Sequence, residues 1–564
     1  MPTSRDLVIA ACGLVILPFL LTGLGLGITS ATEVVVFAVA CMALNILVGH
    51  TGLTSFGHGA WFGLAAYGAA LAQLNLFPGQ MLLPLVSGLA TVAAFSFCFG
   101  FLILRRRGVY FSLLTLALAA MLYSIAFRWT DLTGGENGLG GIKRPTFAGM
   151  NFESATSYYA LVAFIAALVV LALWMFHRSP AGSVLIAIRE NEQRAQFLGY
   201  PTQRYKLLAF TVSATITGLA GTLLLFNNRM TSAEPISVAF SGELLAMVII
   251  GGMRSFLGPA LGALFFVIFR DYLSSIQAYP AISENWLLYF GLTFVAFIVL
   301  SPTGLVGLGA RLLAPFRKVP TEDAAMSQRQ AGTVELPEFL KPQQGVSGPI
   351  LTVENVAKSF GGIKAVRGIS FKVADKSLHA LIGPNGAGKT TAFNLISGMF
   401  SPDQGQVALA GRRIDTLAPA DITQAGIGRS FQITNLFPTL SIEENVRLAV
   451  QARDPARFSI WRSAQGLAQV NEETTAVIRT MGLAGVEKAE AGSLSYGGQR
   501  LLDMSLALAT KPRLLLLDEP LAGLAAAERD RVGRLIKQIS KDVPVLLVEH
   551  DIDRVFQLAD AVTV

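Results

Sequence analysis

Long apolar stretches recur through the first half of the chain, separated by shorter polar segments. Each is close to the roughly 20 residues that a helix needs to cross the hydrocarbon core of a bilayer. The predicted spans are 7–29, 34–48, 54–76, 81–104, 109–127, 158–176, 207–226 and 286–308. The pattern therefore predicts an N-terminal all-α polytopic membrane domain, residues 1–315.

Polar groups interrupt this apolar pattern at a few positions. The stretch 243–270 is broken by Gly251-Gly252-Met253-Arg254, and we expect two half-helices there, because such breaks are tolerated where they are buried or line a cavity. Asn45 and His58 place polar side chains within or beside apolar stretches. With the glycine break they are candidates for a substrate path. The alternative is that each polar side chain is hydrogen-bonded between helices.

Charge and composition support a membrane protein. The hydrophobic fraction of 52% is too high for a wholly soluble protein. Arg105-Arg106-Arg107 and the basic residues between His177 and Lys206 mark cytoplasmic loops by the positive-inside rule. This topology explains the net charge of +7, and no basic-aromatic pattern favours nucleic acid. The three cysteines lie in apolar stretches and predict no disulfide or metal framework.

The pattern changes after residue 315. Residues 316–349 are rich in polar residues, proline and glycine and predict a flexible linker. From Ile350 short apolar strands alternate with helical segments, which predicts a C-terminal α/β domain, residues 350–564. We expect a small β-subdomain from 350–356 and 369–373, and buried parallel strands at 514–517 and 543–548.

A phosphate-binding loop organises this second half. A short apolar strand, Leu378 to Ile382, precedes Gly383-Pro384-Asn385-Gly386-Ala387-Gly388-Lys389-Thr390, and a helix is expected from Thr391. This strand–loop–helix context is the one that G-x-x-x-x-G-K-T requires, and it predicts a P-loop NTPase. The loop N–H groups and Lys389 would bind ATP phosphates, and the Thr390 hydroxyl suits Mg²⁺. The alternative is an ordinary glycine-rich turn.

A second acidic motif fits the same chemistry. Four leucines lead directly into Asp518 and Glu519. Asp518 can hold Mg²⁺, and Glu519 is placed to polarise the attacking water. Alone, this motif would equally be an ordinary strand end.

The charged loop from Ala187 to Ala195 is unusual among the turns of the first half. We expect a short helix that contacts the ATPase, because an ATPase must be mechanically joined to the spans it moves. Glu190 and Glu192 are the predicted coupling residues. The alternative is a solvated loop.

Five segments of the first half resemble landmarks of the branched-chain amino-acid permease family, the membrane subunits of bacterial ABC importers. They are Asn45–Gly49, Thr133–Gly138, Ala187–Gly199, Tyr205–Phe210 and Gly251–Pro259. The resemblance implies an amino-acid path between helices and a coupling loop near 187–199.

The second half resembles the ATP-binding subunit of ABC transporters. The resemblance implies that Phe360 stacks on adenine, that Thr391 contacts the nucleotide, and that Gln432 links Mg²⁺ and water to the membrane domain. It also implies that Leu494–Gln499, with Ser495 and Gly497, closes on the partner's ATP, and that His550 contacts the γ-phosphate. Ala525 stands where Asp or Asn is usual in the family. We therefore expect weaker coupling across the interface between the two ATPase domains. The family usually continues beyond the position of Val564, so we expect a truncated C-terminus.

These observations predict an ATP-driven importer of amino acids, with branched-chain amino acids first, in the bacterial inner membrane with a cytoplasmic ATPase domain. The expected partners are a second permease and ATPase, as a homodimer or heterodimer, an extracytoplasmic solute-binding protein and membrane lipid. Alternatives are an importer of urea, amides or other amino acids, an ABC exporter, or a membrane-anchored ATPase that does not transport.

Overall fold

The computed structural model describes residues 2–144, 146–147, 150–275, 283–301, 303–313, 336–341 and 348–564. The chain forms two compact units. The first comprises Met1–Arg178 and Gln203–Val319, and the second comprises Ser179–Thr202 and Pro320–Val564. Most of the linker predicted at 316–349 lies outside the described residues.

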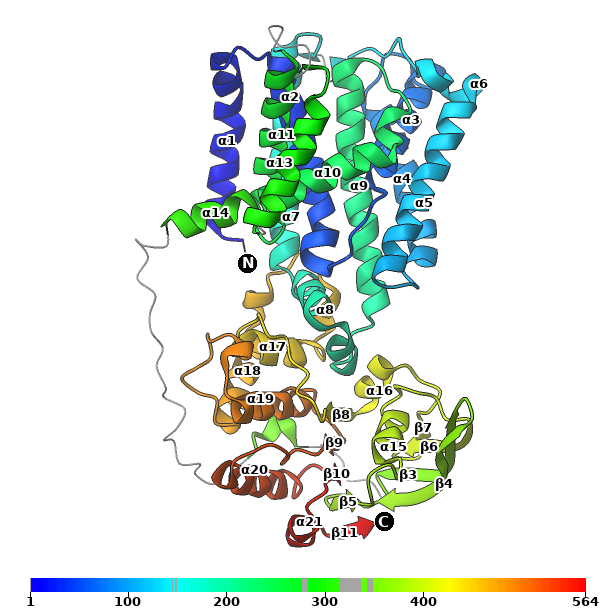
Figure 1. Cartoon of the computed structure of the whole chain (residues 1–564), viewed down its shortest axis with the longest axis vertical. Helices are drawn as coiled ribbons and strands as arrows, with labels where there is room; N and C mark the ends of the chain where they lie inside the picture. The colour runs from blue at the N-terminus through cyan, green and yellow to red at the C-terminus, as the bar shows by residue number, and fades with distance from the viewer. Residues whose placement is uncertain are drawn as a thin grey trace. The chain divides into compact units, whose positions relative to one another are not determined.

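The first unit is a bundle of helices that lie side by side (Figure 1). Its helices are α1 (Ser4–Gly23), α2 (Ile28–Asn45) with the π-helix η1 (Ile46–Thr51), α3 (His58–Asn75), α4 (Leu82–Ile103), α5 (Val109–Arg128), α6 (Thr130–Thr133), α7 (Ala155–Arg178), α9 (Thr202–Asn228), α10 (Val238–Gly251), α11 (Gly258–Ser274), α13 (Trp286–Leu300) and α14 (Gly304–Leu313). The short elements are the 3₁₀ turns η2 (Gly135–Asn137) and η3 (Glu234–Ile236) and the paired strands β1 (Thr146–Phe147) and β2 (Met150–Asn151).

Six helices in the described residues are long and apolar enough to cross a membrane: α1, α2 with η1, α4, α5, α7 and α9. The apolar helices α10 and α13 are shorter. The prediction of one span at 286–308 is wrong, because α13 ends at Leu300 and α14 begins at Gly304. Ser301 leaves helical geometry with φ −139° and ψ 75°. It precedes a proline in the sequence, and that position disfavours the helical region.

The predicted break in the 243–270 stretch is confirmed. Helix α10 ends at Gly251 and α11 begins at Gly258. Gly252 has a φ of 115°, a backbone conformation that favours glycine. A proline in the first turn of α11 has no N–H to lose there, so it suits the restart of the helix.

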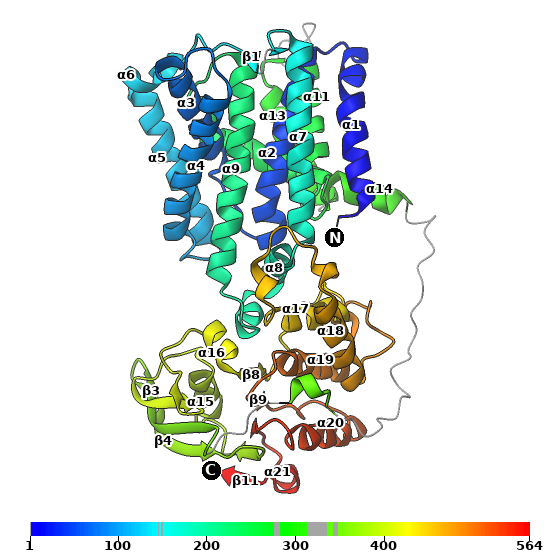
Figure 2. The same ribbon diagram turned by 180° about the vertical axis from the view of Figure 1, so that it is seen from behind.

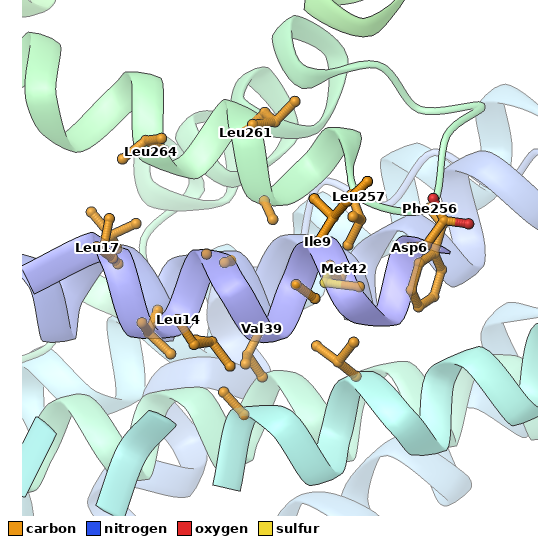
Figure 3. Close-up of a pocket in the computed structure, with 18 of the residues that line it drawn as sticks. Asp6, Ile9, Leu14, Leu17, Val39, Met42, Phe256, Leu257, Leu261 and Leu264 are labelled. Carbon is orange, nitrogen blue, oxygen red and sulfur yellow. The ribbon is translucent and has the colours of Figure 1, made fainter. Parts of the chain in front are cut away.

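Helix α1 lies at the edge of the bundle in two opposite views (Figures 1 and 2). Only 11% of the residues in its most apolar stretch are buried. A cavity of about 490 Å³ lies between α1 and the helices α2, α7 and α11. Figure 3 shows Leu14 and Leu17 of α1 and Val39 of α2 among the side chains that line it. Its lining is apolar except at Asp6 and Ser255. A cavity with so few polar groups suits hydrocarbon better than a zwitterion.

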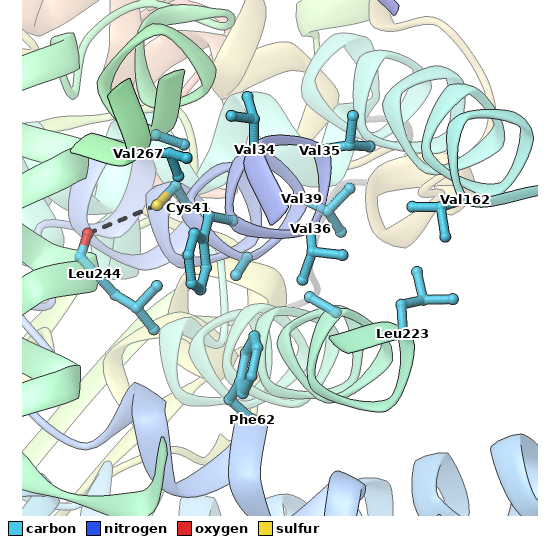
Figure 4. Packing of buried hydrophobic residues seen from close by; sticks show 14 of the residues in the cluster. Val34, Val35, Val36, Val39, Cys41, Phe62, Val162, Leu223, Leu244 and Val267 are labelled. Atoms are coloured by element: carbon cyan, nitrogen blue, oxygen red, sulfur yellow. Dashed lines mark hydrogen bonds between the residues drawn. The ribbon is translucent and has the colours of Figure 1, made fainter. Parts of the chain in front are cut away.

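Helix α2 forms the centre of the first unit, and 89% of the residues in its most apolar stretch are buried. From Val34 to Leu44 every residue is apolar, which is typical of a helix enclosed by others. Figure 4 shows its valines and Cys41 facing side chains of five neighbouring helices: Phe62, Val162, Leu223, Leu244 and Val267. Small residues permit close helix packing at Gly221 and Gly262. A Cβ at either position would overlap a backbone carbonyl of the facing helix.

The second unit contains two sheets with helices around them (Figure 1). The antiparallel sheet has the order β4-β3-β6-β7, and the parallel sheet has the order β11-β5-β10-β9-β8. The strands are β3 (Leu351–Phe360), β4 (Ile363–Val373), β5 (Leu378–Leu381), β6 (Gln404–Leu409), β7 (Arg412–Arg413), β8 (Ile427–Ser430), β9 (Leu514–Asp518), β10 (Val545–Val548) and β11 (Ala561–Thr563). The helices are α8 (Pro180–Phe197), α15 (Lys389–Ile396), α16 (Pro419–Ala425), α17 (Ile442–Gln451), α18 (Ala468–Thr480), α19 (Tyr496–Ala509), α20 (Ala526–Ile539) and α21 (Ile552–Leu558).

The register of the parallel sheet brings four loops to one edge. Val548 at the end of β10 pairs with Leu381 of β5 and with Asp518 of β9. Ser430 at the end of β8 pairs with Leu517 of β9. Because parallel strands end at the same edge, the segments after β5, β8, β9 and β10 start beside one another. The predictions of buried parallel strands at 514–517 and 543–548 are confirmed.

Candidate nucleotide-hydrolysis site

The glycine-rich segment after β5 forms a loop that closes on its own lysine. Helix α15 begins at Lys389, directly after Gly388, whose φ is 90°. A Cβ on Gly388 would overlap the Ala365 carbonyl oxygen, so this position requires glycine. The Lys389 ammonium donates to the carbonyl oxygens of Gly383 at 2.7 Å and Pro384 at 3.0 Å. A cation thus lies at a helix N-terminus, an arrangement suited to phosphate.

The other loop residues are open to solvent. Asn385, Gly386 and Ala387 are exposed, as is Thr390 in the first turn of α15, while Thr391 is half-buried. The Thr390 hydroxyl is therefore accessible to a ligand. The phosphate and Mg²⁺ contacts expected of these residues remain predictions.

Three residues predicted to act in hydrolysis meet at the sheet edge. The Glu519 carboxylate accepts a hydrogen bond from Gln432 Nε2 at 2.9 Å through one oxygen. Its other oxygen pairs with His550 Nε2. Glu519 has a φ of 48°, which is uncommon for a side chain of this size and is typical of strained positions at functional sites. The carboxylate is thus fixed from two sides, by the segments after β8 and β10.

A buried arginine that the sequence analysis did not single out holds these segments together. The Arg500 guanidinium, from α19, donates to the carbonyl oxygens of Asp518 at 2.6 Å, Gln432 at 3.2 Å and Pro520 at 3.2 Å. It also donates to the Phe431 and Glu519 carbonyl oxygens. Arginine suits this position because its planar fork carries five donors. No sequence motif marks it, since its acceptors are all backbone atoms.

Asp518 has the properties of a metal ligand. Among the described residues its Oδ1 is buried and has no hydrogen-bond partner. Its Oδ2 lies 3.8 Å from Arg429 Nη2. Burial raises the pKa of the Asp518 carboxyl, and a nearby cation opposes this shift. An available carboxylate oxygen and an exposed threonine hydroxyl form a donor set of the kind that Mg²⁺ prefers.

The segment Leu494–Gln499 leads into α19 and forms its first turn. The Ser495 hydroxyl caps the helix by accepting from the Gly498 N–H at 3.3 Å, and Ser495 is exposed. Gly497 is buried, and a Cβ there would lie 2.6 Å from a Glu528 carboxylate oxygen. Phe360, at the end of β3, is 42% exposed and therefore accessible for stacking. The nucleotide contacts expected of these residues stay predictions.

The charged loop of the first half is a helix that packs within the second unit, as predicted. Ser179 caps α8 by accepting from the Gly182 N–H, and the helix kinks at Asn191. The Tyr200 hydroxyl donates to the Leu448 carbonyl of α17 at 2.6 Å. The Gln424 amide of α16 donates to the Gly199 carbonyl at 3.2 Å. The segment Ser179–Thr202, called the docking segment below, is thus anchored to two helices.

The two predicted coupling residues are not those that make these anchors. Glu192 accepts from the Thr202 hydroxyl at 3.0 Å, within the docking segment itself. Glu190 is half-exposed. The contacts to the sheet edge come from Arg194, a residue that the sequence analysis placed in the loop without assigning it a role. The coupling role of the two glutamates remains a prediction.

The four candidates for a substrate path fall into two places in the first unit. The Asn45 amide donates to the Ser255 carbonyl in the α10–α11 break at 3.3 Å, beside Gly251 and Gly252. His58 lies elsewhere, with its ring nitrogens 2.8 Å from Ser213 Oγ and 3.0 Å from Ser55 Oγ. Both histidine nitrogens are therefore engaged, one with α9 and the other with the segment that precedes α3, in agreement with the alternative of a packing role. None of the four candidates is among the residues that line the apolar cavity beside α1.

Each half of the chain matches a known protein family. Residues 27–298 match the family described as branched-chain amino acid transport system / permease component. Residues 366–522 match the family described as ABC transporter. BraF of Pseudomonas aeruginosa, a high-affinity branched-chain amino acid transport ATP-binding protein, is 35% identical over 226 residues, which cover 39% of this chain and 89% of BraF. LivG of Escherichia coli, which carries the same description, is 32% identical over 39% of this chain and 89% of LivG.

Two further matches concern the same kind of protein. A ribose import ATP-binding protein, RbsA of Chromobacterium violaceum, is 34% identical over 38% of this chain but only 42% of RbsA. A solved nucleotide-free ATP-binding cassette from an ABC transporter is 27% identical, with a TM-score of 0.34 over 38% of this chain and 86% of that chain. The similar ATP-binding proteins thus differ in the solute that their names give.

Proposed function

The chain belongs to the ABC transporter family and joins a permease of the branched-chain amino acid type to an ATPase, and from this we propose that it imports amino acids, branched-chain amino acids first, across the bacterial inner membrane. It is part of an ABC-type import system whose ATPase hydrolyses ATP coupled to transport. The observation that carries the substrate proposal is the permease match over residues 27–298. The family also implies partner subunits and a substrate-binding protein.

The residues proposed to bind the ATP phosphates lie on the loop after β5 and at the start of α15. The N–H groups between Gly383 and Gly388 would hold the phosphates, with Lys389 on the outer ones. Phe360 would stack on the adenine ring. Thr390, Asp518 and Gln432 would hold Mg²⁺, which when bound neutralises the charge of the phosphate oxygens.

Glu519 is proposed to orient and polarise the water that attacks the γ-phosphate. Its two oxygens are engaged by Gln432 and His550 in the structure, so its position depends on segments from two neighbouring strands. With a γ-phosphate bound, His550 would donate to the phosphate, and Gln432 would contact the metal and the water. A residue held in this way loses little freedom when the substrate binds.

The exposed Ser495 and the buried Gly497 are proposed to contact the ATP of a second ATPase domain. Two such domains would enclose two ATP molecules, and their closure would move the docking segments and the helices α7 and α9 that are continuous with them in sequence. One chain carries one permease and one ATPase, so a second copy or a different pair completes the transporter. An extracytoplasmic binding protein would deliver the solute.

The ribose import relative raises a second candidate substrate class. Its similarity is to an ATP-binding protein, whereas the solute is handled by the permease, and the permease half matches the branched-chain amino acid family. This difference favours an amino acid. Urea and amides remain within the proposed range, because neither the Asn45 amide nor the glycines Gly251 and Gly252 provide an apolar side chain that would select an aliphatic solute.

The test is uptake into vesicles that contain the full complex and its cognate binding protein. Labelled leucine, urea and ribose are supplied separately, with MgATP enclosed on the ATPase side. The proposal expects leucine uptake and none of ribose, with Lys389→Ala complexes as the control for ATP dependence. Urea or ribose uptake without leucine uptake would refute the amino-acid proposal and leave the ATP-driven importer intact.

A further inference from the structure

A fully buried arginine of the docking segment reaches the sheet edge next to the hydrolysis site. Arg194 lies on the last turn of α8, after the kink at Asn191, whose side-chain oxygen accepts from the Arg194 N–H at 3.0 Å. Its Nη1 donates to the Arg429 carbonyl at the end of β8, and its Nη2 donates to the Asp503 carbonyl of α19, each at 3.0 Å. Arg194 and the Asp503 side chain are both 0% exposed.

The charge of Arg194 is balanced by Asp503, whose Oδ1 lies 3.3 Å from Arg194 Nη1. Burial lowers the pKa of the Arg194 guanidinium, and Asp503 opposes this shift. A buried charge is retained only where it is paired, so each of the two residues needs the other to stay in place. The docking segment therefore supplies the counter-ion of a carboxylate inside the second unit.

The second oxygen of Asp503 holds the segment that carries Gln432. Asp503 Oδ2 accepts from the Ser430 hydroxyl at 2.5 Å and from the Phe431 N–H at 3.0 Å. Phe431 immediately precedes Gln432, which donates to Glu519 at 2.9 Å. One carboxylate thus joins Arg194 to the backbone next to Gln432, and Gln432 joins that backbone to Glu519.

A second contact runs from the docking segment in the same direction. Phe197, three residues after Arg194, packs edge-on against Phe431 at 5.0 Å between ring centroids. The Arg429 guanidinium lies 5.6 Å from the Phe197 ring and 4.7 Å from the Phe431 ring, and its Nη2 lies 3.8 Å from Asp518 Oδ2. Phe431 therefore contacts Phe197 of the docking segment on one side and the Arg429 guanidinium on another.

We propose that Arg194 is a positioning residue for ATP hydrolysis, which through Asp503 and the Phe431 backbone sets the place of Gln432 against Glu519. The inference rests on the proposed roles of Gln432 and Glu519. A displacement of the docking segment would withdraw the counter-ion of Asp503, loosen Phe431 and move Gln432 away from the carboxylate. The position of the docking segment would in this way determine the position of Gln432 at the hydrolysis site.

If Arg194 only held the docking segment in place, the same contacts would be seen. The experiment therefore separates this docking role from the positioning of Gln432. ATP hydrolysis is measured on the complete reconstituted transporter for Arg194→Lys, Gln432→Ala and the double variant. Lysine keeps the charge and loses the paired donors. Positioning through Gln432 predicts about a tenfold loss of kcat for Arg194→Lys, with an unchanged KM for ATP, and less than a twofold further loss when Gln432 is already alanine.

The matched control is Tyr200→Phe, which removes the two hydrogen bonds between the Tyr200 hydroxyl and α17, one donated to Leu448 and one accepted from Gln451, away from Gln432. It should change kcat by less than about twofold and by the same factor in both backgrounds. If Arg194→Lys fails to assemble, Arg194→Met with Asp503→Asn removes both charges and keeps an acceptor for the Phe431 N–H. This pair is expected to show the same dependence on Gln432.

Equal losses of kcat from Arg194→Lys in the wild-type and Gln432→Ala backgrounds would overturn the inference and leave the proposed function intact. A Gln432→Ala variant that hydrolyses ATP at the wild-type rate would remove the proposed role of Gln432, and the inference with it. The two failures are therefore distinguishable.

Discussion

Replacing Ala525 by asparagine should stabilise the second unit through the N-terminus of α20. Ala525 is the N-cap residue of this helix, with φ −63° and ψ 155°, and no side chain caps the helix there. It is exposed, so a larger side chain meets no steric barrier. Its backbone already has the extended conformation from which an asparagine oxygen can accept an N–H of the first helical turn.

The expected gain is about 1 kcal/mol in the free energy of unfolding, the typical difference between asparagine and alanine at this position. In a domain of roughly 200 residues this raises the midpoint of thermal unfolding by about 2–4 °C. Aspartate should give at least as large a rise, because a negative charge at a helix N-terminus also interacts with the helix dipole.

The assay is calorimetry of the purified chain, in which the transition of the second unit is identified by its upward shift with added MgATP. The control is Ala526→Asn, one residue further along. It is exposed too but lies inside the helix, where asparagine lowers helix propensity and caps nothing. An unchanged midpoint for Ala525→Asn, or an equal rise for both variants, would refute the capping argument.

Three other predictions concern binding, coupling and pH. Lys389→Ala should lose most ATP affinity in a nucleotide-binding assay, whereas Glu519→Gln should still bind ATP and lose hydrolysis; wild-type turnover by Glu519→Gln would contradict its role. Replacing Glu190 and Glu192 by alanine should reduce solute uptake more than basal ATPase activity, and equal losses would indicate an assembly defect instead. The pKa of Asp560 is held below its usual value by a backbone N–H of β5 and then by a lysine. Its contribution to stability is thus complete above about pH 4 and is lost as pH falls through the lowered pKa. Asp560→Asn should flatten the fall of the unfolding midpoint below pH 4, and an unchanged slope would exclude this contribution.

The phosphate loop and the acidic strand end could be predicted because each is a local sequence motif with fixed spacing. Lys389 and Asp518 therefore fall where the sequence indicated, at the same edge of one parallel sheet. The break at Gly251 was equally local, because it depends on glycines at the break itself.

The contacts made by Arg194 could not be predicted in this way. Its partner Asp503 lies 309 residues further along the chain, and neither residue belongs to a motif whose spacing indicates the pair. Arg500 was missed for a different reason, since it binds carbonyl oxygens that every residue carries. The division of the 286–308 stretch was missed because the apolar pattern continues across it, although the proline after Ser301 in the sequence disfavours helix there.

In the transporter proposed above, ATP hydrolysis at the sheet edge drives uptake of an amino acid through the permease half of the chain. The most direct measurement follows ATP hydrolysis and labelled leucine uptake in the same vesicles, with the complete complex and its binding protein. We predict that leucine stimulates hydrolysis, that uptake rises in proportion, and that Glu519→Gln abolishes both while ATP still binds. Leucine uptake that persists in the Glu519→Gln complex, or a rate of ATP hydrolysis that does not change with leucine and binding protein, would refute this coupling of hydrolysis to uptake.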